Sequence, residues 1–136
     1  MPRASSSSNG ALRVDRGRVV HNPLIELQRW YEAQCDGDWE HTYGVQIDTL
    51  DNPGWSVEIH VEGTALAEAP FDSAKVERSE RDWLTCWVGM PDRPNPTGVQ
   101  ALAFRAACGP ENLSEVLGIF LDWARRSAPW DARDGR

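Results

Sequence analysis

Five side chains that could carry out chemistry stand between positions 35 and 41: Cys35, Asp36, Asp38, Glu40 and His41. Carboxylates at this density could hold a hard cation, and a thiol beside an imidazole could act as a nucleophile with its base. The spacing does not match an EF-hand loop, because the glycine comes too early and no glutamate closes the series. The sequence therefore predicts no metal site here.

Catalysis by this segment is also disfavoured by its charge. Carboxylates around Cys35 are expected to raise the pKa of the thiol and to suppress the reactive thiolate. A zinc site built from Cys35, His41 and His60 has no obvious fourth ligand. The sequence also lacks a serine nucleophile elbow, a phosphate-binding glycine loop and a dinucleotide fingerprint. We therefore predict no catalytic residues, no cofactor and no enzymatic activity; a small enzyme that uses the Cys35–His41 loop, with or without a metal, is the alternative.

Acidic charge and aromatic residues coincide in this part of the chain. No Lys or Arg occurs between Arg29 and Lys75, whereas ten acidic residues do. Such a run can be a simple solvated face. Trp and Tyr among carboxylates instead favour a protein-binding surface with apolar anchors and a charged surround. The predicted partner-binding residues are Asp36, Asp38, Trp39, Glu40, His41, Asp51, Asn52, Trp55 and Glu58.

Some of these residues also have a structural interpretation. Trp39 and Trp55 could belong to the core, His41 could fix its loop through a hydrogen bond, and Asn52 could serve the turn that contains it. The sequence leaves these alternatives open.

The net charge limits the class of partner. Residues 1–21 contain four Arg and one Asp, so this segment carries +3 and the remaining residues carry −10 of the total −7. An acidic domain repels phosphates, so we expect no nucleic-acid partner and a basic protein partner instead. The four Arg of residues 1–21 are the one feature that favours nucleic acid.

Targeting features point to the cytoplasm. The N-terminal residues have no apolar core of a signal peptide, and no apolar run is long enough for a membrane span. The three cysteines show no metal-binding spacing. Their odd number, in a chain without a signal peptide, predicts reduced thiols. We therefore expect a cytoplasmic protein without a membrane partner; the sequence does not set its oligomeric state.

The elements that position the acidic segment follow from periodicity. Asn22 and Pro23 predict the start of a helix over 23–34, whose apolar stripe (Leu24, Leu27, Gln28 and Tyr31, with Trp30 beside it) would cover a sheet. Gly37 is available for a left-handed turn. Alternation predicts strands over 43–50 and 55–62, joined by a turn at 51–54 in which Gly54 would take a positive φ.

The second half of the chain completes the pattern. Polar alternation predicts an outer strand over 72–79, and an apolar run predicts an interior strand over 83–88. A Pro-rich loop over 89–98 separates it from a short Ala-rich strand over 99–107. After Gly109–Asn112 a final helix follows, with an apolar stripe of Leu113, Val116, Leu117, Phe120, Leu121 and Ala124.

This order of elements predicts an α+β fold. An antiparallel sheet of about four or five strands would carry the N-terminal and C-terminal helices packed on one face. The chain would form one α+β domain over residues 22–128. A disordered, basic, Ser-rich tail would precede it at 1–21, and a flexible tail would follow at 129–136.

Three long segments resemble the immunity protein 53 family of bacterial polymorphic toxin systems. They are LQRWYEAQCDGDWEHTYGVQIDTLDNPGWSVEIHVEGTAL, ERSERDWLTCWV and GPENLSEVLGIFLDWA, in this order. The resemblance covers about residues 24–126. The basic tail and the longer Pro-rich segment near 89–98 depart from the family pattern.

The resemblance implies a small cytoplasmic α+β protein that binds and neutralises a cognate toxin. It supplies no catalytic residues. A basic, nuclease-type toxin is one class that would fit the acidic surface, because a nuclease must itself bind a polyanion. Besides the enzyme, an adaptor domain of an unrelated assembly is an alternative.

Overall fold

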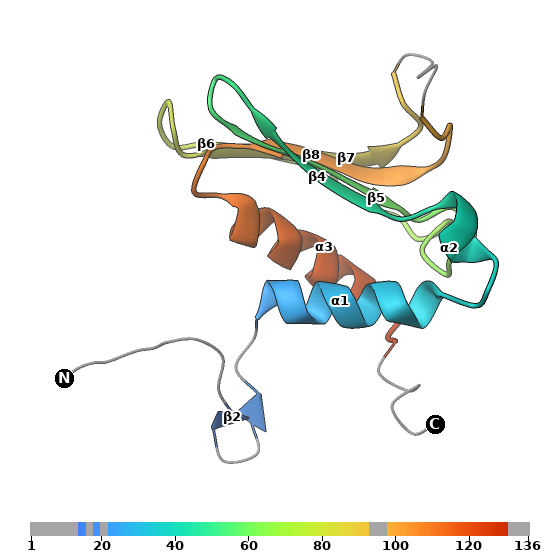
Figure 1. Cartoon of the computed structure of the whole chain (residues 1–136). Coiled ribbons are helices and arrows are strands. Elements are labelled where there is room, and N and C mark those ends of the chain that lie inside the picture. The colour runs from blue at the N-terminus through green and yellow to red at the C-terminus, as the bar shows by residue number, and fades with distance from the viewer. Residues whose placement is uncertain (1–13, 16–17, 20–21, 93–97, 131–136) are drawn as a thin grey trace.

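A five-stranded antiparallel sheet and two long helices form most of the packed part of the described chain, as the computed structural model shows (Figure 1). The structure describes residues 14–15, 18–19, 22–92 and 98–130. The main elements are α1 (Pro23–Gln34), α2 (Trp39–Thr42), β4 (Val45–Leu50), β5 (Gly54–His60), β6 (Ala74–Glu77), β7 (Trp83–Gly89), β8 (Ala103–Cys108) and α3 (Leu113–Ser127). The predicted α+β class is confirmed, and α1 has the predicted bounds.

The strand order in the sheet is β4-β5-β8-β7-β6. The Ala-rich strand β8 is therefore the middle strand, paired with β5 on one side and with β7 on the other. The apolar strand β7 is interior, as predicted, and lies between β8 and β6. β4 and β6 are the two edges, and each has one unpaired side.

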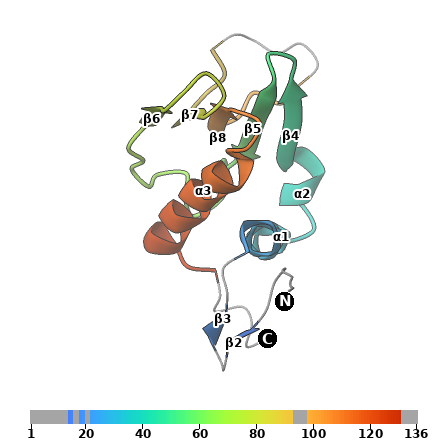
Figure 2. The ribbon, with the colours of Figure 1, turned by 90° about the vertical axis from the view of Figure 1, so that its left-hand side faces the viewer.

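The register divides the sheet into an apolar face and a polar face. Val57 lies opposite Ile47 on β4 and Ala106 on β8, whereas its neighbour Glu58 lies opposite Gln46 and Arg105. Successive residues of a strand point to opposite faces. Figures 1 and 2 show α1 and α3 on the same side of the sheet and no helix over the other side. Val57 and Ala106 are buried, so the face that the helices cover is the apolar one.

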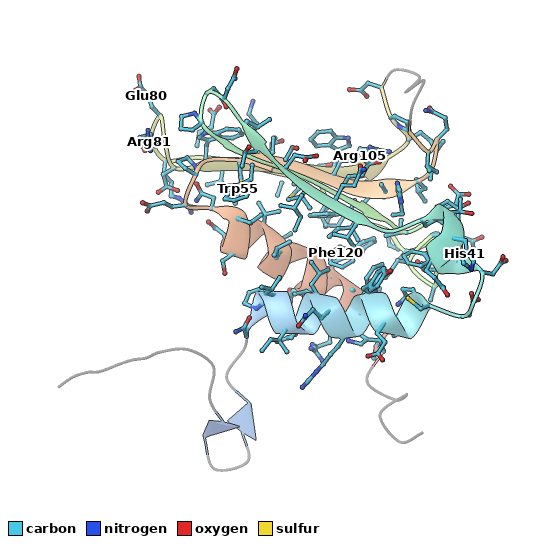
Figure 3. All side chains as sticks on the ribbon, in the orientation of Figure 1. His41, Trp55, Glu80, Arg81, Arg105 and Phe120 are labelled. Carbon is cyan, nitrogen blue, oxygen red and sulfur yellow. The ribbon has the colours of Figure 1, made fainter. Side chains whose placement is uncertain are left out.

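Aromatic rings fill the space between the sheet and the helices. The ring of Phe120 on α3 lies 4.9 Å from Trp30 of α1 and 5.2 Å from Phe104 of β8, centroid to centroid. All three side chains are almost completely buried, and Figure 3 shows Phe120 between the two layers. Edge-to-face contacts of this kind add to the energy of burial. The buried positions of α3 are Val116, Leu117, Phe120, Leu121, Trp123 and Ala124.

The apolar stripe predicted for α1 is wrong in part. Leu27 and Trp30 are the buried residues of this helix, whereas Leu24 is 60% exposed and Tyr31 is 38% exposed. The helix packs against α3, where Glu26 pairs with Arg125 at 2.6 Å. In this packing Trp30 lies in the core and part of the predicted stripe faces solvent.

The turn between β4 and β5 also differs from its prediction. Gly54 does not have a positive φ; within the described residues, Gly37 and Gly63 do. Gly54 is the first residue of β5, and a Cβ atom there would overlap with the carbonyl oxygen of Cys108 on β8. The position requires glycine because two backbones approach closely, not because the turn is left-handed.

The two predicted tails lie mostly outside the described residues. Within the first, β2 (Val14–Asp15) and β3 (Arg18–Val19) form a short antiparallel ladder. Within the second, Trp130 is buried and Arg125 lies 4.7 Å from the centre of its ring. The packed domain therefore extends past the predicted boundary at residue 128.

Candidate partner-binding surface

The acidic segment before β4 folds around its own carboxylates. Asp36 Oδ1 accepts hydrogen bonds from the backbone N–H groups of Asp38 and Trp39, both at 2.9 Å. The Glu40 carboxylate accepts from the N–H groups of Asp36 at 3.0 Å and Gly37 at 2.8 Å. This reciprocal pattern works like a capping box and produces the single turn of α2. Gly37 has the predicted left-handed conformation, with φ of 92°.

These hydrogen bonds favour the charged form of both carboxyl groups. The N–H groups of Trp39 and Asp38 lower the pKa of Asp36. The pKa of Glu40 is lowered by its own N–H, by those of Asp36 and Gly37, and by His41. Asp36 and Glu40 therefore hold the loop together, in addition to the partner contact predicted for them.

We expect acid to loosen this segment. A carboxyl group with a lowered folded-state pKa contributes stability above its unfolded value, near 4, and loses that contribution as the pH falls through the folded value. NMR titration should give each of Asp36 and Glu40 a midpoint below the value of the same residue type in an unfolded chain, about 3.9 for Asp and about 4.3 for Glu. Midpoints at or above these values would contradict this account of the loop.

Trp39 is buried inside the same loop. Its side chain is 6% exposed, and its indole N–H donates to the Glu62 carbonyl oxygen at 2.8 Å. Its ring packs edge-on against Trp30. Partner contact by Trp39 stays a prediction that this burial does not favour. Asp38 and His41 are exposed, and Figure 3 shows His41 on the outer side of α2.

Asp51 and Asn52 lie far from this loop. They are exposed in the turn that follows β4, whereas α2 precedes β4, so the length of a strand separates the two acidic groups (Figure 1). Trp55 is the second residue of β5, where it is half-buried and its indole N–H donates to the Pro110 carbonyl oxygen at 3.0 Å. The predicted residues therefore do not form one continuous patch.

Glu58 belongs to a polar network on the face of the sheet that no helix covers. Its Oε2 lies 3.2 Å from Arg105 Nη1 and 3.1 Å from His60 Nε2. The Gly44 N–H donates to His60 Nδ1 at 2.9 Å, so the ring hydrogen is on Nε2 and points to Glu58. The charge of Glu58 is thus balanced within the protein.

Arg105 extends the network to the Pro-rich segment. Its Nε donates to the Gly89 carbonyl at 3.0 Å, and its Nη2 donates to the Ala101 carbonyl at 2.9 Å. These two residues stand at the two ends of the segment between β7 and β8. A single guanidinium group therefore holds both ends of this segment by hydrogen bonds. Figure 3 shows Arg105 on the side of the sheet that faces away from the helices.

The described residues bring together no constellation for metal binding. No group of three or more His, Cys, Asp or Glu side chains in that part of the chain could hold a metal ion. Cys35 Sγ donates to the Tyr31 carbonyl oxygen at 3.3 Å, and no hydrogen bond joins it to His41 among the contacts of the described residues. No helix of the described chain is long and apolar enough to cross a membrane.

Three exposed residues near β4 were absent from the predicted set. Leu24 and Tyr31 were assigned to the buried face of α1, and their exposure depends on how α1 packs against α3. Asp48 is exposed on β4, and strand alternation alone could have identified it. These residues carry the apolar area and the unpaired charge that a partner could bind.

Comparison with known proteins identifies one relationship. A model of the family described as Immunity protein 53 matches residues 24–125. No curated protein and no solved structure matches the chain. The match runs from the first turn of α1 to the last turn of α3 and so includes all five strands of the sheet. The chain therefore belongs to the immunity protein 53 family, whose name describes proteins that give protection against a toxin.

Proposed function

We propose that this protein binds a cognate toxin in the cytoplasm and neutralises it by covering part of its surface. The observation that carries the proposal is the family match over residues 24–125, which includes all five strands of the sheet and nearly all of α1 and α3. Occlusion requires only surface complementarity, which this domain can supply without an active site.

The charge of the exposed side chains supports a basic partner. Asp38, Asp48 and Asp51 are exposed, and no hydrogen bond or ion pair engages their carboxylates among the described contacts. Unpaired carboxylates attract a basic surface and accelerate association with it. The same charge disfavours nucleic acid. A toxin that acts on nucleic acid is one class that offers such a basic surface, because it must bind a polyanion itself.

Survival of cells that express the toxin tests the proposal and separates it from the enzyme alternative. A candidate toxin, taken from a gene next to that of this chain, is expressed with and without the protein, and we expect growth only with it. Cys35→Ser and His41→Gln should still protect, because one lost hydrogen bond costs about 0.5–1.5 kcal/mol. If Cys35 or His41 were instead a catalytic nucleophile or a metal ligand, its replacement should abolish protection.

Two outcomes would contradict the proposal. Failure of the wild-type protein to bind the purified toxin would remove the inhibitor function. Loss of all protection in a Cys35→Ser or His41→Gln variant that circular dichroism shows to be folded would favour catalysis by the loop.

A further inference from the structure

We propose that the free edge of β4, together with the groove between β4 and α1, is the docking site for an extended basic segment of the toxin. The segment would pair with β4 as an additional antiparallel or parallel strand and insert an apolar side chain into the groove. This inference rests on the proposed function and specifies where the toxin binds.

The hydrogen-bond pattern shows which backbone groups are free at this edge. The His60 N–H donates to the Gly44 carbonyl at 3.0 Å, which makes this a hydrogen-bonded pair. In an antiparallel ladder, such pairs alternate with pairs that do not exchange hydrogen bonds. The register therefore directs the N–H and C=O groups of Val45, Ile47 and Thr49 away from β5. No other segment of the described chain pairs with this side of β4.

The two edges of the sheet differ in how they are protected. The β6 edge is four residues long and contains Lys75. The β4 edge is six residues long and contains neither Lys nor Pro. Short edge strands and charged residues, Lys above all, are the usual means of preventing strand addition. The longer edge has Asp48 as its one charged residue, which would repel an acidic strand but attract a basic one, so this edge remains able to accept a basic strand.

An apolar groove lies beside this edge. It has a volume of about 420 Å³ and is lined by Leu24, Leu27, Gln28 and Tyr31 of α1 and by Gly44, Val45 and Ile47. Leu24 and Tyr31 are two of the three exposed large apolar residues in the described part of the chain; the third is Met90. Two of these three exposed apolar side chains thus lie in the groove next to the free backbone groups.

Charge indicates what occupies the groove. None of its lining residues is basic, and exposed carboxylates stand near both ends of β4, at Asp38 and Asp51, and on the strand itself, at Asp48. A second copy of this chain would bring the same acidic edge and be repelled. A strand with Lys or Arg would be attracted along its whole length.

The alternation of β4 also predicts the pattern of the toxin segment. Val45 and Ile47 face the groove, whereas Gln46 and Asp48 face the opposite side of the sheet. Side chains of an added strand alternate in the same way. We therefore expect apolar residues on the groove side of the segment and Lys or Arg on the Asp48 side.

Amide hydrogen exchange of the full chain, free and bound to the purified toxin, tests this site. The amides of Val45, Ile47 and Thr49 should exchange quickly in the free protein and at least tenfold more slowly in the complex. Gln46 and Asp48, whose amides already bond to β5, should be slow in both states. This alternation distinguishes strand pairing from general coverage of the surface.

A pair of matched variants tests the groove. Leu24→Gln should weaken toxin binding about tenfold. Met90→Gln, which removes an apolar side chain that is 51% exposed and outside the groove, should change binding less than about twofold. Both residues are exposed, so neither change should affect folding.

The outcomes separate the docking site from the proposed function. Tight toxin binding without protection of the three outward amides, or with equal effects of the two variants, would overturn the site and leave the function intact. No toxin binding would overturn both. Protection of the same amides in the free protein, increasing with its concentration, would show a second copy at the edge and would also overturn the inference.

Discussion

Replacing Phe120 by alanine should destabilise the domain by about 3–5 kcal/mol. The side chain is completely buried, and its ring contacts Trp30, Phe104 and Trp123 from two helices and the sheet. Those rings belong to rigid elements and cannot collapse fully into the space left. The loss is a large share of the roughly 5–15 kcal/mol that stabilises an ordinary domain. Chemical denaturation, followed by tryptophan fluorescence, measures it.

An exposed residue of α1 provides the control for this prediction. Leu24→Ala also removes a large apolar side chain from a helix, but from a position that is 60% exposed. Its effect should stay within about 0.5 kcal/mol. Similar losses for the two variants would show that Phe120 does not occupy the centre of the core.

Replacing Arg105 by alanine should cost about 3–5 kcal/mol, because it leaves Glu58 without its cationic partner in a half-buried position. The side chain of Arg105 is 14% exposed and that of Glu58 is 26% exposed, so solvent screens this pair only in part. The change also removes the donors to the Gly89 and Ala101 carbonyls. Urea denaturation gives the loss, and limited proteolysis should show faster cleavage between residues 90 and 100.

A surface ion pair on α3 provides the matched control. Arg126 lies 3.2 Å from Asp122, and both side chains are largely exposed. Arg126→Ala should therefore cost no more than about 1 kcal/mol. Arg105→Lys, which keeps the charge but loses the forked donor geometry, should fall between the two. An Arg105→Ala variant as stable as Arg126→Ala would show that the network contributes little.

Elements with a strong local pattern could be predicted from the sequence. The start of α1 follows from Asn22, whose side-chain oxygen accepts from the N–H groups of Leu24 and Ile25. The β4–β5 hairpin and the buried face of α3 follow from periods of two and 3.6 residues. In each case the residues that determine the element are near one another in the chain.

Features that depend on distant segments could not be predicted. Which side of α1 is buried depends on its contact with α3, for example between Glu26 and Arg125. The need for glycine at position 54 arises from Cys108 on another strand. The charge of Glu58 is balanced by Arg105, which is also distant in sequence. The acidic character of this region is evident from its composition. The distance between Asp38 and Asp51, which lie at opposite ends of β4, is evident only from the fold.

The turn at α2 was missed for a different reason. Its signal is local, since Asp36 and Glu40 cap the backbone of the same loop. In the sequence alone, a carboxylate that accepts backbone N–H groups of its own loop has the same signature as one that faces a partner. Short helical turns depend on such side-chain bonds more than on periodicity.

The two hydrogen bonds from Arg105 make the segment between Gly89 and Ala101 a suitable place to insert new sequence. Arg105 belongs to β8 and bonds the carbonyl groups of both Gly89 and Ala101. The distance between these two residues is therefore set by Arg105 and the sheet, and not by the residues between them. The entropy of closing a longer loop grows only slowly, by about 0.6 kcal/mol for each doubling of its length. A peptide tag or a second binding module could therefore be grafted there while β7 and β8 keep their pairing.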